Sequence, residues 1–82
     1  MDTYGQSLKM LPVESDQIEA VGFIEKTHSL YIKFRNSPPM LFEKVPSFRF
    51  QGFLAAPRKD AYFRTFIQGH FLSKETSLPM GG

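Results

Sequence analysis

The residue types that usually catalyse reactions or bind metals are few in this chain and widely spaced. His28 and His70 lie far apart, and no sequence pattern places an acid beside either. Two such histidines do not predict a metal site, which needs several ligands brought together. Glu14 and Asp16 flank Ser15, a pattern typical of a turn. Cysteine, a Gly-x-Ser-x-Gly motif and a glycine-rich phosphate loop are all absent from the sequence. We therefore expect no enzyme, cofactor, metal or small-molecule substrate.

Aromatic and basic side chains are concentrated in one stretch, PSFRFQGFLAAPRKDAYFRTF, which runs from Pro46 to Phe66 and holds six aromatic rings. Such rings either fill a hydrophobic core or form a platform on which nucleic-acid bases stack. Residues 1–30 carry two basic against five acidic residues, whereas residues 31–82 carry eight basic against three acidic residues. This basic C-terminal portion is compatible with a polyanionic partner and equally with an ordinary solvated surface.

Four strands are predicted before the helical part of the chain. The segment SLYIKFR, at 29–35, is the clearest, because apolar and polar side chains alternate along it. An edge strand containing a proline is expected at 8–14, a strand with a bulge at Gly22 is expected at 18–25, and a further strand is expected at 40–45.

The hydrophobic period then changes from two to about 3.6 residues, which predicts helices. Pro46 marks the start of a first helix and Pro57 marks its end. A second helix is predicted from Asp60, as its N-cap, to about Gln68, with Gly69 after it. The phenylalanines that recur at helical spacing are expected in the core: Phe50, Phe53, Phe63, Phe66 and Phe71.

These elements predict an α+β fold, with an antiparallel β-meander of three to four strands followed by two short helices packed on one sheet face. We expect a flexible N-terminus over 1–7, one domain over 8–72 and a disordered polar tail over 73–82. The N-terminal residues include an early acid and no apolar run, so neither a signal peptide nor a membrane span is expected. The absence of cysteine fits a cytoplasmic protein.

The pairing of the strands at 29–35 and 40–45 stays open at this point. In one register Met40 and Phe42 lie beside Lys33 and Arg35 on the solvent face. In the other register, one residue away, they join Ile32 and its neighbours inside. The apolar character of Met40 and Phe42 favours the buried arrangement.

The order of several short motifs resembles that of the KTSC domain, a family named for its occurrence at the C-terminus of some lysyl-tRNA synthetases and also found as a free-standing small bacterial protein. The matching pieces, spread over roughly residues 12 to 71, are Val13-Glu14-Ser15-Asp16-Gln17-Ile18 with Val21-Gly22-Phe23, then Leu30, Ile32 and Phe34, then Val45-Pro46, then Phe53, Leu54 and Ala56, and finally Tyr62, Phe63 and Ile67. The resemblance implies the same small α+β domain, and RNA is the ligand usually suggested for the family.

The sequence departs from the family pattern at three places. Met40 and Phe42 stand where the family has a Tyr-x-Tyr pair. Arg58-Lys59-Asp60 replaces a Ser-x-Gly step between the helices, and Arg64 replaces a common asparagine. Any family role that needs the two tyrosine hydroxyls is therefore in doubt for this chain.

The candidate nucleic-acid-binding residues combine basic side chains with two rings suited to stacking. They are Tyr31, Lys33, Arg35, Lys44, Phe48, Arg49, Arg58, Lys59 and Arg64. The basic members from Lys44 onward are expected to form one continuous face that binds tRNA or another structured RNA, with an affinity that falls steeply with salt. The alternative function is docking of a protein partner or a second copy of the chain through exposed Phe48, Tyr62 or Met40.

Overall fold

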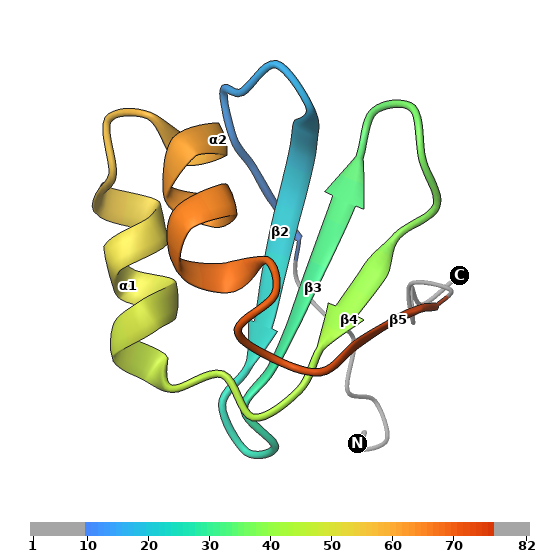
Figure 1. Cartoon of the computed structure of the whole chain (residues 1–82), viewed down its shortest axis with the longest axis vertical. Helices are drawn as coiled ribbons and strands as arrows, with labels where there is room; N and C mark the ends of the chain where they lie inside the picture. The colour runs from blue at the N-terminus through green and yellow to red at the C-terminus, as the bar shows by residue number, and fades with distance from the viewer. Residues whose placement is uncertain (1–9, 77–82) are drawn as a thin grey trace, which may run out of the picture.

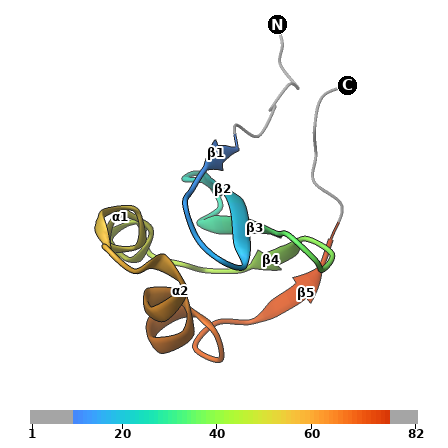
Figure 2. The same cartoon turned by 90° about the horizontal axis from the view of Figure 1, so that it is seen from above.

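The computed structural model describes residues 10–76, which form one antiparallel sheet with helices on a single face (Figure 1; Figure 2). Its strands, in spatial order, are β1 (Leu11–Pro12), β2 (Ile18–Ile24), β3 (Ser29–Phe34), β4 (Met40–Phe42) and β5 (Ser73–Glu75). Its helices are α1 (Ser47–Ala55), α2 (Lys59–Tyr62) and the π-helix η1 (Phe63–Ile67), which continues α2. No helix within residues 10–76 is long and apolar enough to cross a membrane.

The predicted α+β class is confirmed, but the sheet has five strands rather than three to four. The additional strand, β5, pairs with β4 and lies in the segment expected to be a disordered tail. All three of its residues are exposed, so no apolar pattern marks it in the sequence. The expected N-terminal segment 1–7 and the end of the tail, 77–82, lie outside the described residues.

The register of β3 against β4 answers the question that the sequence left open. Leu30 lies opposite Phe42, and Ile32 lies opposite Met40. Phe42 is almost fully buried, and Met40 packs against the core. The buried register is therefore the correct one, and a solvent-facing patch containing Phe42 does not form. Strand β4 stops at Phe42 rather than at residue 45 because Lys44 adopts a positive φ of 58°.

The core lies between the sheet and the helices. Its buried members are Ile18, Val21, Leu30, Ile32, Phe42, Val45, Phe50, Phe53, Phe63 and Ile67. Three of the five expected core phenylalanines are among them, and Phe71 is half-buried against the cluster. Phe66 is the exception, because its side chain is 40% exposed on the outer side of η1.

The helices begin and end close to the predicted positions, with two corrections. Pro46 precedes α1 in extended conformation, and Pro57 follows its end, as expected. The N-cap of α2 is Arg58, not Asp60, which lies inside the first turn and bonds to another part of the chain. The last turn is a π-helix, in which the Gln68 N–H donates to the Phe63 carbonyl at 2.8 Å. Gly69 then reverses the chain with a φ of 82°.

The bulge in the sheet also differs from the expectation, because it lies between Ile18 and Ala20 rather than at Gly22.

Candidate functional site

The nine predicted nucleic-acid-binding residues do not form one surface. Tyr31 and Lys33 lie on the sheet face that turns away from the helices, because their strand neighbours Leu30 and Ile32 point into the core. Lys33 also forms an ion pair with Glu19, with Nζ and Oε1 3.0 Å apart. Its charge is therefore already matched within the sheet.

Four of the basic residues gather where the loop before β2 meets the start of α2. Arg35 donates from Nε to the Ser15 carbonyl at 3.3 Å, and Lys59 donates from Nζ to the Ala56 carbonyl at 2.8 Å. Arg58 and Arg64 are exposed beside them. A hollow of about 300 Å³ at this place is lined by as many acidic as basic residues, with Glu14, Asp16 and Asp60 facing Arg58, Lys59 and Arg64. The hollow itself therefore has no excess of positive charge.

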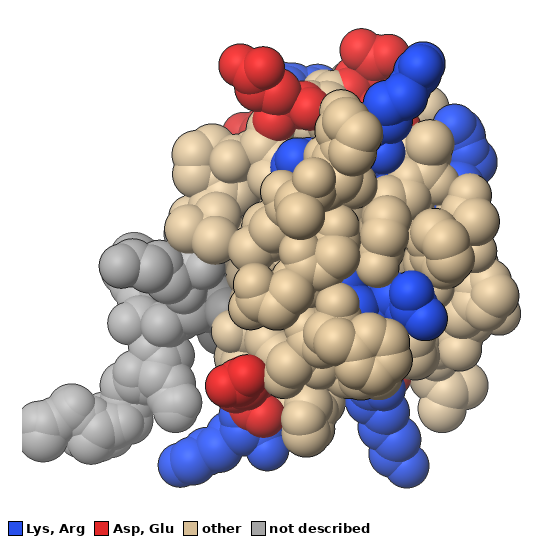
Figure 3. Space-filling view, turned by 90° about the vertical axis from the view of Figure 1, so that its left-hand side faces the viewer, with Lys and Arg blue, Asp and Glu red and all other residues tan. Residues whose placement is uncertain are grey.

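Lys44 lies apart from all of these, in the loop between β4 and α1, where it lines a shallow hollow with Thr27 and His28. The face that carries α1 is largely uncharged, and the basic side chains on it are separated by tan surface or accompanied by acidic ones (Figure 3). Lys44 therefore lines a different hollow from Arg58, Lys59 and Arg64, and the expected continuous basic face of Lys44, Arg49, Arg58, Lys59 and Arg64 stays a prediction.

One compact group on the helical side combines exposed rings with a cation, and we call Phe48, Arg49, Tyr62 and Phe66 the aromatic–arginine cluster. The Arg49 guanidinium carbon lies 5.1 Å from the Phe48 ring centroid and 4.9 Å from that of Phe66. Its Nη1 is 3.4 Å from the Tyr62 hydroxyl oxygen. The Phe48 side chain is 65% exposed. The cluster thus presents a ring to solvent with a planar cation beside it.

The local fold explains why this cluster forms. Phe50 and Phe53 turn one side of α1 toward the sheet, which places Phe48 and Arg49 on the part of the helix that borders η1. There the Tyr62 ring packs against Phe66 with centroids 4.7 Å apart. The Nε of Arg49 is buried without a hydrogen-bond partner, and within residues 10–76 no ion pair involves Arg49. Its charge is uncompensated there.

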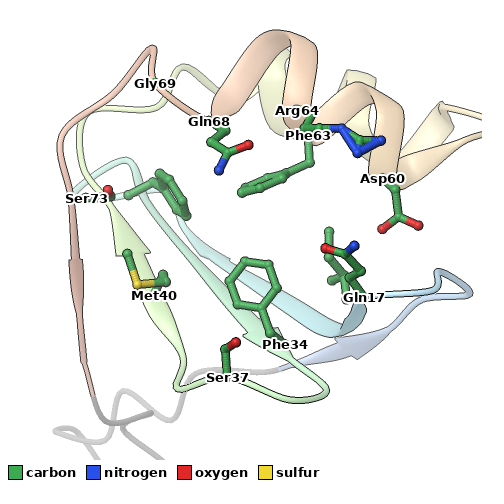
Figure 4. A pocket seen from close by; sticks show the side chains of 12 residues that line it. Gln17, Phe34, Ser37, Met40, Asp60, Phe63, Arg64, Gln68, Gly69 and Ser73 are labelled. Atoms are coloured by element: carbon green, nitrogen blue, oxygen red, sulfur yellow. The ribbon is translucent and has the colours of Figure 1, made fainter.

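A second feature is a cleft of about 490 Å³ between the sheet and η1 (Figure 4). Its floor is apolar, and Phe63 meets the ring edges of Phe34 and Phe42 at centroid distances of 5.7 and 5.5 Å. Its rim is polar, with the amides of Gln17 and Gln68 and the charges of Asp60 and Arg64. Figure 4 shows Phe34, Met40, Phe63 and Gln68 around the opening, with Arg64 and Asp60 next to each other at one side of it.

Asp60, at the rim of this cleft, is hydrogen-bonded to the loop before β2. It accepts a hydrogen bond from the Ser15 hydroxyl and another from the Asp16 N–H at 3.0 Å. The Ser15 hydroxyl lowers the pKa of Asp60, burial opposes that effect, and the backbone N–H groups of Asp16 and Gln17 and the Arg64 charge add to the lowering. Asp60 is therefore ionised at neutral pH.

Metal chemistry has little basis in the described part of the chain. His28 and His70 are both exposed and lie in different turns. Residues 10–76 contain no group of three His, Cys, Asp or Glu side chains placed to hold a metal ion.

Comparison with known proteins identifies the fold. The model of the KTSC domain family matches residues 14–71, which include Ser15, Asp60 and the whole aromatic–arginine cluster. The chain belongs to the KTSC domain family. A crystal structure of a KTSC domain protein from Yersinia pestis is similar to it, with a TM-score of 0.84 and 28% identity, and the match covers 87% of this chain and 100% of that chain. A comparison with curated proteins gave no match.

Several residues of this KTSC domain belong to the aromatic–arginine cluster or to the cleft, although sequence reasoning had assigned them other roles or none. Phe66 belongs to the aromatic–arginine cluster, although spacing assigned it to the core, and Tyr62, which the sequence offered only as a candidate for docking a protein partner, completes the cluster. Among the cleft residues, Gln17 stood only within a stretch that resembles the family pattern, Gln68 marked only the expected end of a helix, and Asp60 was interpreted as a helix cap. The sequence contained a usable signal only for Asp60. An acid at the start of a helix can form hydrogen bonds outside its own helix, and a serine in a distant turn, such as Ser15, can be its partner.

Proposed function

We propose that this KTSC domain is a small binding module, not an enzyme, which contacts unpaired bases of RNA through the aromatic–arginine cluster. The observation that carries the proposal is an exposed Phe48 ring in contact with Arg49, whose charge has no ion-pair partner among residues 10–76. A nucleotide offers a flat base for such a ring and a phosphate for such a cation. Base stacking on an aromatic side chain contributes roughly 1–3 kcal/mol and tolerates any base.

The positions of the other basic residues support a short contact rather than a broad electrostatic one. Lys33 is paired with Glu19 on the other sheet face, and the group around Arg58 is balanced by acids. We therefore propose that one or two bases and their phosphates are bound, with unpaired tRNA segments among the suitable RNAs. A cytoplasmic location, where RNA is abundant, is part of this proposal.

The test compares the affinity of the protein and its variants for a labelled single-stranded RNA octamer, measured by fluorescence anisotropy. Replacing Phe48 by alanine removes the stacking surface, so the affinity is expected to fall about tenfold. Leu72→Ala is the matched control, because Leu72 is an apolar side chain of similar exposure, 73%, outside the cluster. Equal affinities for the two variants, or no binding by the unmodified protein, would refute the proposal.

A second candidate function is docking of a protein partner or of a second copy of the chain on the same cluster. It is favoured by the largely uncharged character of the face that carries α1 (Figure 3). Aromatic residues and arginine are enriched at the centres of protein interfaces. Met40, one of the three residues considered for this role, lines the cleft instead. Self-association would appear as a mass that rises with chain concentration, persists in high salt and is lost in Phe48→Ala.

A further inference from the structure

The cleft between the sheet and η1 is separate from the aromatic–arginine cluster, since the two share no lining residue. Its volume of about 490 Å³ lies within the range of small-ligand pockets, about 300–1,000 Å³. A π-helix forms its upper wall, and single π-helical turns are frequent at functional sites. These two features make the cleft the strongest candidate for a further binding site.

The floor of the cleft suits a flat apolar surface. Phe34 is only partly buried in the domain, although its strand neighbours on the same face are core residues. Phe63 meets it edge to face at 70°. Figure 4 shows the Phe34 ring standing at the centre of the opening between Met40 and Gln17. An aromatic ligand that enters here stacks on or packs beside Phe34 and removes apolar surface from water.

The polar groups on the rim of the cleft favour a ligand whose edge carries hydrogen-bond donors and acceptors. Gln17 and Gln68 each offer a donor and an acceptor in one plane. Arg64 offers donors only, and ionised Asp60 offers acceptors only. Each Asp60 oxygen accepts one of the two bonds from Ser15 and Asp16, which leaves acceptor capacity on the carboxylate. An aliphatic ligand would leave these groups without partners when it displaced their water, which costs free energy.

The two charges on the rim are not joined in an ion pair within the described part of the chain. Arg64 lies close enough to Asp60 to lower its pKa, yet the two form no ion pair among residues 10–76. One cation and one anion that lie close together on the rim favour a ligand that is itself uncharged but carries both acceptors and donors. Heterocyclic bases have this pattern along their edges.

We propose that the cleft binds a single nucleobase, stacked on Phe34 and held at its edge by Arg64, Asp60 and the two amides. Guanine fits best. Its acceptor pair, O6 and N7, can take two hydrogen bonds from a guanidinium, and its N–H groups can donate hydrogen bonds to a carboxylate. The base belongs either to a free nucleotide or to an unpaired position of an RNA. The proposal is independent of the RNA contact at Phe48.

The test is a titration of the ¹⁵N-labelled protein, followed by NMR, with GMP, AMP, CMP and UMP, and with ribose 5-phosphate as the ligand without a base. GMP is expected to shift the Gln17 and Gln68 side-chain amides and the Gly69 backbone amide, and to bind about tenfold more tightly than UMP. Ribose 5-phosphate should leave these signals in place. No shifts with any of the four nucleotides, or equal shifts with ribose 5-phosphate, would overturn the proposal.

Two variants with the same change of charge make the test specific. Arg64→Gln removes the guanidinium at the cleft, and about tenfold weaker binding of GMP is expected. Arg58→Gln removes an exposed guanidinium that does not line the cleft, and unchanged binding is expected. Equal affinities of the two variants for GMP would contradict the role of Arg64.

RNA oligonucleotides that differ only in a central guanine or uracil distinguish the two sources of the base. Cleft shifts with the guanine oligonucleotide identify an RNA base, and cleft shifts with GMP alone identify a free nucleotide; both support the proposal. Phe48→Ala separates this site from the cluster, because the variant should keep its response to GMP. Loss of that response in Phe48→Ala would overturn the assignment of the base to the cleft.

Discussion

The Ser15 hydroxyl donates a hydrogen bond to the Asp60 carboxylate, across a sequence separation of 45 residues. Ser15 Oγ also accepts a hydrogen bond from the Ile18 N–H at 3.1 Å. One serine thus fixes the start of β2 and ties it to α2, which holds Asp60 of the cleft rim and continues into the turn that holds Arg64. This contact positions the helix more directly than any capping bond, since α2 has no side-chain cap.

Replacing Ser15 by alanine should destabilise the domain. The variant loses a hydrogen bond to a charged acceptor and leaves the Ile18 N–H without its acceptor, so the free energy of unfolding is expected to fall by about 1–2 kcal/mol. Urea denaturation measures this difference. Ser37→Ala, at an exposed serine of the β3–β4 loop, is the control and should change the free energy by less than about 0.5 kcal/mol. Equal effects of the two variants would show that the contact does not hold the helix.

The same contact predicts a dependence of stability on acid. The folded-state pKa of Asp60 lies below the ordinary value of 3.8, so the folded protein binds fewer protons at this group than the unfolded chain does. The resulting stabilisation is complete above the unfolded-state pKa and is lost as the pH falls through the lower folded-state pKa. The difference in unfolding free energy between the unmodified protein and Asp60→Asn should therefore stay constant from pH 7 down to about pH 5 and shrink as the pH falls through 3.8 and below. A difference that stays constant at the lower pH values as well would contradict the assignment.

Local sequence patterns predicted the strands and helix ends that depend on neighbouring residues rather than on contacts between distant segments. Alternation identified β3, and Pro46, Pro57 and Gly69 marked the helix ends near their true places. Strand β5 was missed because its exposed residues carry no apolar pattern, and its pairing with β4 comes from tertiary structure. The π-helix was missed for a similar reason, since Phe63 packs against Phe34 and Phe42 on strands far away in the sequence.

The candidate site was predicted only in part. Phe48 and Arg49 were named, but periodicity cannot show how far a sheet extends beneath a helix, and so Phe66 was placed in the core. The cleft was not predicted because its rim comes from three separate segments, represented by Gln17, Asp60 and Gln68. Gln17 stood in a stretch that resembles the family pattern and Asp60 was expected to cap a helix, and neither pattern indicated a cleft.

A substitution at Gly52, whose Cα faces the Tyr62 side chain, would disturb the aromatic–arginine cluster. A Cβ at this position of α1 would overlap the Tyr62 hydroxyl oxygen and lie 3.0 Å from its ring carbon Cζ. Alanine normally favours a helix over glycine by about 1 kcal/mol, but here the overlap should dominate and destabilise the domain by about 1–2 kcal/mol. Adding Tyr62→Phe removes the hydroxyl and should recover part of the loss in thermal unfolding. No recovery in the double variant would contradict this packing.

Arg49→Lys tests whether geometry or charge matters in the cluster. Lysine keeps the positive charge but lacks the planar guanidinium that lies against Phe48 and Phe66. The affinity for single-stranded RNA is expected to fall roughly fivefold, and Arg58→Lys should leave it unchanged. Unchanged affinity in Arg49→Lys would mean that charge alone is sufficient.

The salt dependence of RNA binding should be shallow. A contact with one or two phosphates of a single strand gives a slope of about −0.7 to −1.4 in a plot of log affinity against log salt concentration. The continuous basic face predicted from the sequence would have given a much steeper slope. A slope beyond about −3 would show that the dispersed basic residues act together.

The most direct test of the proposed RNA contact is an NMR titration of the ¹⁵N-labelled domain with a mixed tRNA pool, at low and at near-physiological salt. The account predicts amide shifts centred on Phe48, Arg49 and Phe66 that persist at the higher salt. It is contradicted if shifts are absent at both salt concentrations, if they vanish at the higher one, or if they occur at Lys33 and Arg35 without the cluster.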